Sequence, residues 1–246
     1  ADITGVKGEG DTAGSTLNAN TLTLVKPGDA DGASVTMTAL QNNSFSTAST
    51  TGTADKITIS NAAAVTGLSG IEEYVLAAGA QTFTLGSAAQ KVTANSTGGN
   101  GAIVIDTDTQ TTVSGTFTSA GNDTIKLNVE TTNTNISTAT TTDVDTIDLS
   151  TTNMSATMSI AQHLKLNAAA GTNTVTLSDA GTVAADTLVE SYVLAAAGGT
   201  TITLSAVGQN VDTGGSETGD TIDVAGLSAT GRFDTVSGDT IKLSTG

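Results

Sequence analysis

The fold of this chain is decided by residues 188–204, LVESYVLAAAGGTTITL, which repeat residues 71–85, IEEYVLAAGAQTFTL. Tyr192 follows Tyr74 at an offset of 118 residues. The offset stays nearly constant on both sides of this pair, which is the signature of one structural unit present twice. We therefore divide the chain into two copies, residues 1–127 and residues 128–246. Two further matches support this division: ITISN at 57–61 with VTLSD at 175–179, and NDTIKL at 122–127 with GDTIKL at 238–243.

Each copy consists of short runs in which aliphatic and hydroxyl side chains alternate. In TTITL, residues 200–204, Ile202 and Leu204 would share one face of a strand, and Thr201 and Thr203 the other. Aromatic residues make up only 2% of the chain, so the core has to be mainly aliphatic. Tyr74 and Tyr192, flanked by Val and Leu, are expected to pack in it. Thin layers stacked many times suit such a core better than one thick centre.

These features predict an all-β protein, a parallel β-solenoid built from two tandem repeats of about 118 residues. Two tandem β-sandwiches are the alternative, because a copy of this length also suits an immunoglobulin-like domain. Helix is expected only as a turn or two at residues 62–65 and 160–170, where alanines gather. The polar residues 128–143 are either a linker or a Thr-faced coil with a weak interior.

The charge balance restricts the partners. Eight Lys and Arg against 24 Asp and Glu give a net charge of −16, which repels nucleic acid and anionic lipid. No apolar run approaches the roughly 18 residues of a spanning helix, so we expect no membrane insertion. The absence of Cys excludes disulfides, thiol catalysis and thiolate metal sites. Divalent cations are the natural counter-charge.

Aspartates in two settings are the candidate metal ligands. The run AGNDTIKL at 120–127 resembles one turn of the nonapeptide repeat of calcium-binding RTX proteins, GGxGxDxUx, where U is a large aliphatic residue. Its Asp-Thr-Ile core recurs with fewer glycines, so calcium and plain turn chemistry remain alternatives. GDADG at 28–32 has the aspartate spacing of calcium loops, although Ala33 and Leu40 stand where an EF-hand needs oxygen ligands. The candidate calcium ligands are Asp29, Asp31, Asp123, Asp145, Asp220 and Asp239.

We expect no enzymatic activity. His163 is the only histidine and lies in AQHLKL without a catalytic Ser or Asp signature, so a half-exposed structural role is expected. Glu72, Glu73 and Glu190 could in principle form the carboxylate pair of a glycosidase. However, Glu72 and Glu190 occupy equivalent positions of the two copies, as a repeated surface feature would. No P-loop, dinucleotide fingerprint or zinc spacing is present.

The bias towards Thr, Ala, Gly, Asn and Asp, the missing Cys, the duplicated YVLAA blocks and the GNDTI-type turns are similar to those of bacterial surface-layer proteins and large RTX-type surface proteins. The resemblance implies a structural protein at the extracellular face of a bacterium, self-assembling as a homo-oligomer, lattice or filament with calcium as cofactor. A cell-surface polysaccharide is a further implied partner. Because the tandem glycine-rich array is missing, calcium dependence stays open.

The alternative function is a stalk or a ligand-binding module, adhesive or ice-binding, within a large secreted surface protein. Rows of T-x-T resemble the ice-binding faces of several antifreeze proteins. The irregular intervals between these rows argue against a lattice-matching surface.

Overall fold

The computed structural model describes residues 21–24, 32–50, 54–76, 81–94, 103–107, 109–118, 122–127, 133–149, 153–195, 197–215, 219–228 and 230–243. The predicted calcium ligands Asp29 and Asp31 lie outside these residues. Contacts divide the chain into two compact units. Unit 1 holds residues 1–110, 114–126 and 139–145, and unit 2 holds residues 111–113, 127–138 and 146–246.

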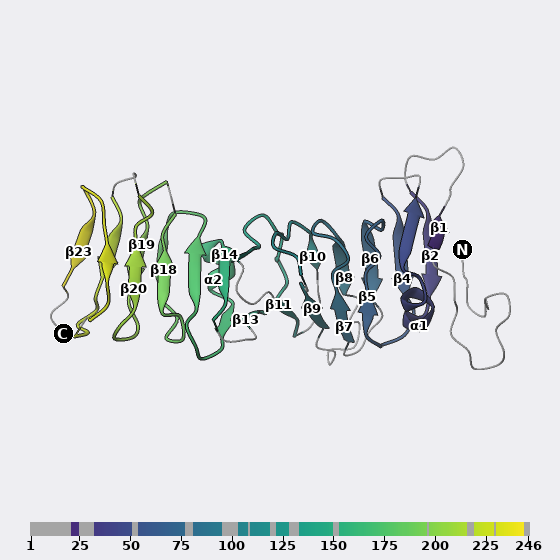
Figure 1. Cartoon of the computed structure of the whole chain (residues 1–246), viewed down its shortest axis with the longest axis horizontal. Helices are drawn as coiled ribbons and strands as arrows, with labels where there is room; N and C mark the ends of the chain where they lie inside the picture. The colour runs from purple at the N-terminus through teal and green to yellow at the C-terminus, as the bar shows by residue number, and fades with distance from the viewer. Residues whose placement is uncertain are drawn as a thin grey trace. The chain divides into compact units, whose positions relative to one another are not determined.

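Unit 1 is a stack of coils whose consecutive strands alternate between two sheets (Figure 1). All of its strand pairs are parallel, and β1 (Thr21–Leu24) pairs with β3 (Thr47–Thr50). One sheet has the order β10 (Phe117–Thr118), β8 (Lys91–Ala94), β6 (Glu73–Leu76), β4 (Lys56–Ile59) and β2 (Ser34–Met37). The other contains β11 (Thr124–Leu127), β9 (Ile103–Asp106), β7 (Gln81–Thr84) and β5 (Val65–Thr66).

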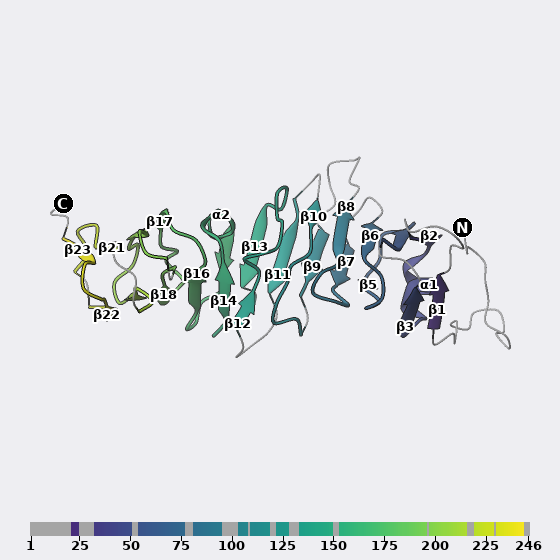
Figure 2. The ribbon, with the colours of Figure 1, turned by 90° about the horizontal axis from the view of Figure 1, so that it is seen from above.

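Unit 2 repeats this parallel arrangement (Figure 2). One sheet has the order β12 (Asn133–Asn135), β14 (Ser155–Met158), β16 (Thr174–Leu177), β18 (Ser191–Val193), β20 (Asn210–Asp212) and β22 (Phe233–Asp234). A second contains β17 (Thr182–Ala184), β19 (Thr201–Thr203), β21 (Thr221–Asp223) and β23 (Thr240–Lys242). β13 (Thr146–Leu149) pairs with β15 (Leu166–Ala168).

Parallel pairing stacks like residues in columns through the core. Ile57 pairs with Tyr74, 17 residues later, and Val92 pairs with Phe117, 25 residues later. Alternate residues of each strand point inwards, so the aliphatic side chains are buried while the Thr side chains line the outer faces. The prediction of a parallel β-solenoid is confirmed. The β-sandwich alternative is wrong, because a sandwich requires antiparallel sheets.

The protein contains little helix, and the sequence predicted the positions of the helices only in part. Among the described residues two short helices occur, α1 (Ala39–Asn43) and α2 (Ile160–His163). Each begins with a capping box, Thr38 with Gln41 in α1 and Ser159 with Gln162 in α2. The prediction of a helix at residues 62–65 is wrong. The helix predicted within residues 160–170 is shorter than expected, and α1 was not predicted.

The polar stretch between the copies contains a strand in its described part. β12 directs Thr134 into the interior, where this side chain is fully buried, and Ile136 is buried just after it. A coil rather than a linker is therefore present at residues 133–136, but its outer face carries Asn133 and Asn135, and its Thr lies in the interior. No helix in the described part of the chain has the length and apolarity needed to cross a membrane.

Candidate functional site

A buried tyrosine is anchored at the same place in both copies. The Tyr74 hydroxyl accepts a hydrogen bond from the Leu68 N–H at 2.8 Å and donates to Asn42 Oδ1 at 3.2 Å. The Tyr192 hydroxyl accepts from the Asp186 N–H at 2.7 Å and lies 2.9 Å from His163 Nε2. Both tyrosines pack in the core, as predicted.

His163 is not the half-exposed residue that the sequence suggested. Its side chain is only 5% exposed, because the first turn of α2 directs the ring inwards onto Tyr192. Burial lowers the pKa of His163, and the carboxylate of Asp186 opposes this shift. Nδ1 has no hydrogen-bond partner among the described residues. The ring therefore sits where Asn42 sits in the first copy, as a partner of the tyrosine.

A glutamine closes one turn in each copy. Gln90 Nε2 donates to the carbonyls of Leu68 and Ile71, and its Oε1 accepts from the N–H of Gly86. Gln209 makes the equivalent bonds to the carbonyls of Asp186 and Val189 and to the N–H of Ser205. Both side chains are buried, so they satisfy backbone groups that water cannot reach. These glutamines are structural.

The residue just before many strands links one coil to the next. Its side chain accepts a hydrogen bond from the backbone N–H at the corresponding position of the preceding coil. Asp220 Oδ1, for example, accepts from the Thr200 N–H at 2.7 Å, and Asp239 Oδ1 accepts from the Asp220 N–H at 3.1 Å. We call these residues the inter-coil acceptors: Asp55, Glu72, Asp145, Asn173, Glu190, Asp220 and Asp239.

Two pairs of the predicted calcium ligands are brought together by this arrangement. In unit 1, the Asp123 N–H donates to Asp145 Oδ2 at 3.0 Å. In unit 2, Asp239 also accepts hydrogen bonds from the Thr213 hydroxyl at 2.7 Å and the Val236 N–H at 3.0 Å. Partial burial opposes the ionisation of Asp239, but its hydrogen bonds outweigh this effect and lower its pKa. The Asp239 carboxylate is thus already well supplied with protein donors.

Asp220 is in a different situation. It is fully buried, its Oδ2 has no partner among the described residues, and burial raises its pKa. A proton or a cation would satisfy this oxygen. Calcium takes six to eight oxygen ligands, and no group of three or more His, Cys, Asp or Glu in the described residues is arranged to hold a metal ion. The geometry therefore explains the aspartates first as inter-coil acceptors.

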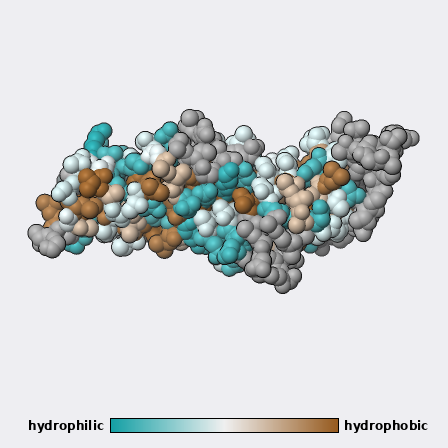
Figure 3. Space-filling model, turned by 90° about the horizontal axis from the view of Figure 1, so that it is seen from below, coloured by the Kyte–Doolittle hydropathy of each residue, from teal (hydrophilic) through white to brown (hydrophobic). Residues whose placement is uncertain are grey.

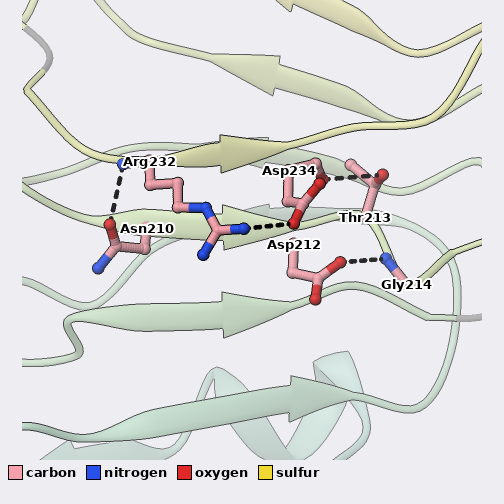
Figure 4. Close-up of polar contacts among 6 residues, drawn as sticks. All are labelled: Asn210, Asp212, Thr213, Gly214, Arg232 and Asp234. Carbon is pink, nitrogen blue, oxygen red and sulfur yellow. Dashed lines mark hydrogen bonds and ion pairs between the residues drawn. The ribbon is translucent and has the colours of Figure 1, made fainter.

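The outer face of β18, β20 and β22 carries a hollow of about 350 Å³ that is lined by both polar and apolar residues. We call it the outer groove. Arg232 Nη2 pairs with Asp234 Oδ2 at 2.9 Å, and the Arg232 N–H donates to Asn210 Oδ1 at 2.9 Å (Figure 4). Asp212 lies opposite Asp234 in the parallel register and accepts from the Gly214 N–H. The groove is lined by Ser191, Tyr192, Val193, Asn210, Val211, Asp212, Arg232 and Asp234.

The residues that line the outer groove differ from those at the same positions of the first copy. The inward residues beneath it, Val211 and Phe233, have counterparts of the same type in Val92 and Phe117. The outward residues differ, since Thr93 and Thr118 of β8 and β10 stand where the second copy has Asp212 and Asp234. Arg232 is the only arginine of the chain. Sequence reasoning missed this site, although two aspartates one coil apart on an outward face were a usable signal.

The last described coil of unit 2 exposes part of its inward column. Ile241 continues the inward column of Val183, Ile202 and Ile222, yet it is 44% exposed, whereas Ile202 and Ile222 are fully buried. Leu243 is 77% exposed. β23 pairs only with β21 among the described strands. In Figure 3, brown apolar atoms appear at the left end of the surface, over the C-terminal strands of Figure 1. We call this edge the open end.

Comparisons with protein-family models, with curated proteins and with solved structures gave no match.

Proposed function

We propose that this chain is a structural, self-assembling segment of a bacterial extracellular surface layer or filament. The observation that carries the proposal is the parallel solenoid within each unit, in which successive coils stack inward aliphatic columns. Repeat proteins of this kind contact only neighbouring repeats and present extended, regular surfaces, which suits a structural element of a layer or filament.

The rest of the described chain supports a structural role. Several polar side chains that reach the interior satisfy backbone groups or link coils, as Gln90, Gln209 and the inter-coil acceptors do. His163 is engaged with Tyr192 rather than placed in a cleft. The resemblance to surface-layer and RTX-type proteins favours an extracellular location.

Sedimentation velocity of the purified chain over a range of concentrations tests the proposal. The experiment is run in EGTA and then in millimolar calcium. Growth of large species with concentration in either buffer is the expected result, and growth only in calcium would make calcium the cofactor of assembly. A monomer at every concentration in both buffers would contradict self-assembly.

The outer groove favours a second candidate function, a ligand-binding module of a surface adhesin. A volume of about 350 Å³ lies at the lower end of the range of ligand pockets, roughly 300–1,000 Å³. Carboxylates, an amide and a guanidinium together suit a polyhydroxylated ligand such as a cell-surface polysaccharide. Calorimetric titration with bacterial polysaccharides tests this. The Asp212→Thr/Asp234→Thr variant, which carries the first-copy residues, should lose binding, and equal binding by both proteins would contradict it.

The outer face of β17, β19, β21 and β23 gives little support to ice binding. Thr182, Thr201, Thr221 and Thr240 form an unbroken column in the parallel register. The neighbouring column on the same face contains Asp223 and Lys242, which form an ion pair at 2.7 Å. One row of Thr beside charged side chains does not make a flat, two-row surface.

A further inference from the structure

We infer that the outer groove holds one end of a linear, uncharged polysaccharide, and that the rest of this ligand lies along the outer face of unit 2, from β18 towards β12. This inference rests on the second candidate function, a ligand-binding module, and names the class of its ligand. The shape of the groove, the polar side chains that lead into it and the charge of the strands that bear them support it.

The outer groove is a trough between two rows of side chains. Its floor is the backbone at Tyr192 and Val211, because both of these side chains point into the core and are almost fully buried. Its walls are outward side chains that stand two residues apart along each strand, about 6.8 Å. At β22 the Arg232 guanidinium reaches along the strand to Asp234 and closes one end of the trough (Figure 4). The other end faces β16.

Two columns of outward side chains continue from the groove across the sheet, because its strands pair in parallel and in register. We call them the polar columns, since they carry hydroxyl and amide groups. They are Asn133, Ser155, Thr174, Ser191 and Asn210 on one side, and Asn135, Thr157 and Thr176 on the other, where Val193 follows and leads to Asp212.

Several groups of the polar columns are available to a ligand. The hydroxyls of Ser155, Thr174 and Thr176 are half-exposed and form no side-chain hydrogen bond within the described part of the chain. A hydroxyl both donates and accepts a hydrogen bond. Successive coils repeat such groups about every 4.8 Å, so a chain molecule with hydroxyls at short, regular intervals finds a partner on each coil. Polysaccharides have this property.

The strands that carry the polar columns are uncharged in a strongly acidic chain. β12, β14, β16 and β18 contain no charged residue, although the net charge of the chain is −16. In the groove Arg232 compensates Asp234, whereas no cationic side chain of the described residues pairs with Asp212. A negatively charged polysaccharide would be repelled by this carboxylate and by the acidic protein, and a neutral one would not.

The first copy shows that the solenoid does not require an uncharged face. In its corresponding sheet, Lys56, Glu73 and Lys91 stack in the parallel register, and Lys91 pairs with Glu73 at 3.2 Å. The counterparts in the second copy are Thr174, Ser191 and Asn210. The hydroxyl and amide groups of this column are therefore not needed for stacking, which favours a role in binding.

The length of the ligand should decide its affinity. The polar columns contain no aromatic ring on which a sugar can stack, so binding relies on hydrogen bonds to successive coils. Each such bond contributes only about 0.5–1.5 kcal/mol, because it replaces a bond to water. A ligand that spans several coils should therefore bind much more tightly than one that fills only the groove.

Calorimetric titration with neutral 1,4-linked chains of glucose, mannose or N-acetylglucosamine tests the inference. Chains of two and of six sugars are compared. At least one six-sugar chain should bind about tenfold or more tightly than its two-sugar form, and about tenfold or more tightly than a six-sugar galacturonate chain, which is anionic. Equal affinity for two and six sugars, or galacturonate binding as tightly as the neutral chains, would overturn the inference.

Two variants separate this inference from the groove function on which it rests. Thr174→Lys carries the first-copy residue and lies outside the groove, and it should weaken binding of the six-sugar chain about tenfold or more, because the longer side chain covers the polar columns. Thr201→Lys, on the outer face of β19 in the other sheet, is the matched control and should bind as the unmodified chain does.

The outcomes are distinguishable. If Thr174→Lys binds normally while Asp212→Thr/Asp234→Thr has lost binding, the ligand ends at the groove, and the inference fails while the groove function stands. If the unmodified chain binds none of the neutral chains, the inference fails, and the groove function stands only if another polysaccharide still requires Asp212 and Asp234. Shaping of ice crystals in that case would assign the polar columns to ice.

Discussion

At the residue scale, one buried tyrosine hydroxyl is held by different partners in the two copies. Asn42 accepts from Tyr74, and His163 takes the same place beside Tyr192. An amide has no charge to gain near neutral pH, whereas an imidazole does. At this position, the change from Asn to His gives the second copy a group that titrates near neutral pH, which the first copy lacks.

His163 should make the protein less stable as the pH falls below about 6.5. Its pKa is lowered in the folded protein by burial, so the unfolded chain takes up a proton first and the free energy of unfolding falls. The loss is at most about 1.4 kcal/mol for each pH unit. Urea denaturation at pH 7.5, 6.5 and 5.5 measures it. His163→Asn, which copies the first repeat, should flatten this dependence, and an unchanged slope would contradict the argument.

Removal of the buried glutamine should be costly in either copy. Gln90→Leu leaves the carbonyls of Leu68 and Ile71 and the N–H of Gly86 without their partner, and each unsatisfied buried group costs about 1–3 kcal/mol. We expect a loss of about 2 kcal/mol or more in chemical denaturation. The more exposed Gln110→Leu is the control and should cost less than about 0.5 kcal/mol. Equal losses of stability in the two variants would show that the hydrogen bonds of Gln90 do not account for the destabilisation.

At the element scale, the strands were predictable and the helix α1 was not. Alternation of aliphatic residues with Thr is a local property, so it identified the strands and the inward Tyr74 and Tyr192. The capping box Thr38-x-x-Gln41 was visible in the sequence, but the apolar run around it fits a strand equally well. Its helical conformation depends also on Asn61, whose side chain accepts the Ala39 N–H at 2.8 Å from the next coil.

The candidate site was predictable to the same extent. The recurrence of Asp-Thr-Ile at about one coil length brings Asp220 beside Asp239, so the sequence identified residues that do lie together. It did not reveal that backbone N–H groups of the preceding coil occupy their oxygens, because that depends on the register. The outer groove was missed for the same reason, since Asp212 and Asp234 become neighbours only through the pairing of β20 with β22.

Asp220 distinguishes an inter-coil acceptor from a cation ligand. Its pKa is raised by burial, so the folded state disfavours the charged carboxylate, and stability is lost as the pH rises through the folded pKa. Asp220→Asn keeps the oxygen that accepts from Thr200 and removes the charge. It should raise the melting temperature at pH 7 in EGTA, whereas Asp220→Ala should lower stability by about 1–3 kcal/mol.

Calcium changes this expectation in a defined way. If a calcium ion occupies the site, millimolar calcium should raise the melting temperature of the unmodified chain and not that of Asp220→Asn. If Asp220→Asn is as destabilising as Asp220→Ala in EGTA, the acceptor role of Asp220 is contradicted.

At the scale of the whole molecule, the two copies share several inward positions and differ at several outward ones. Core positions such as Val92 and Val211 are preserved between the copies, while outward positions such as Thr93 and Asp212 have diverged. A solenoid tolerates this because each coil needs only matching inward columns from its neighbours. The same rule lets a solenoid serve as a repetitive structural element, which is the central claim of the proposed function.

Negative-stain electron microscopy of the purified chain, in EGTA and then in millimolar calcium, tests that claim most directly. Ordered sheets or filaments that grow with protein concentration, in either buffer, are the predicted result. Single particles of monomer size at every concentration in both buffers would contradict it.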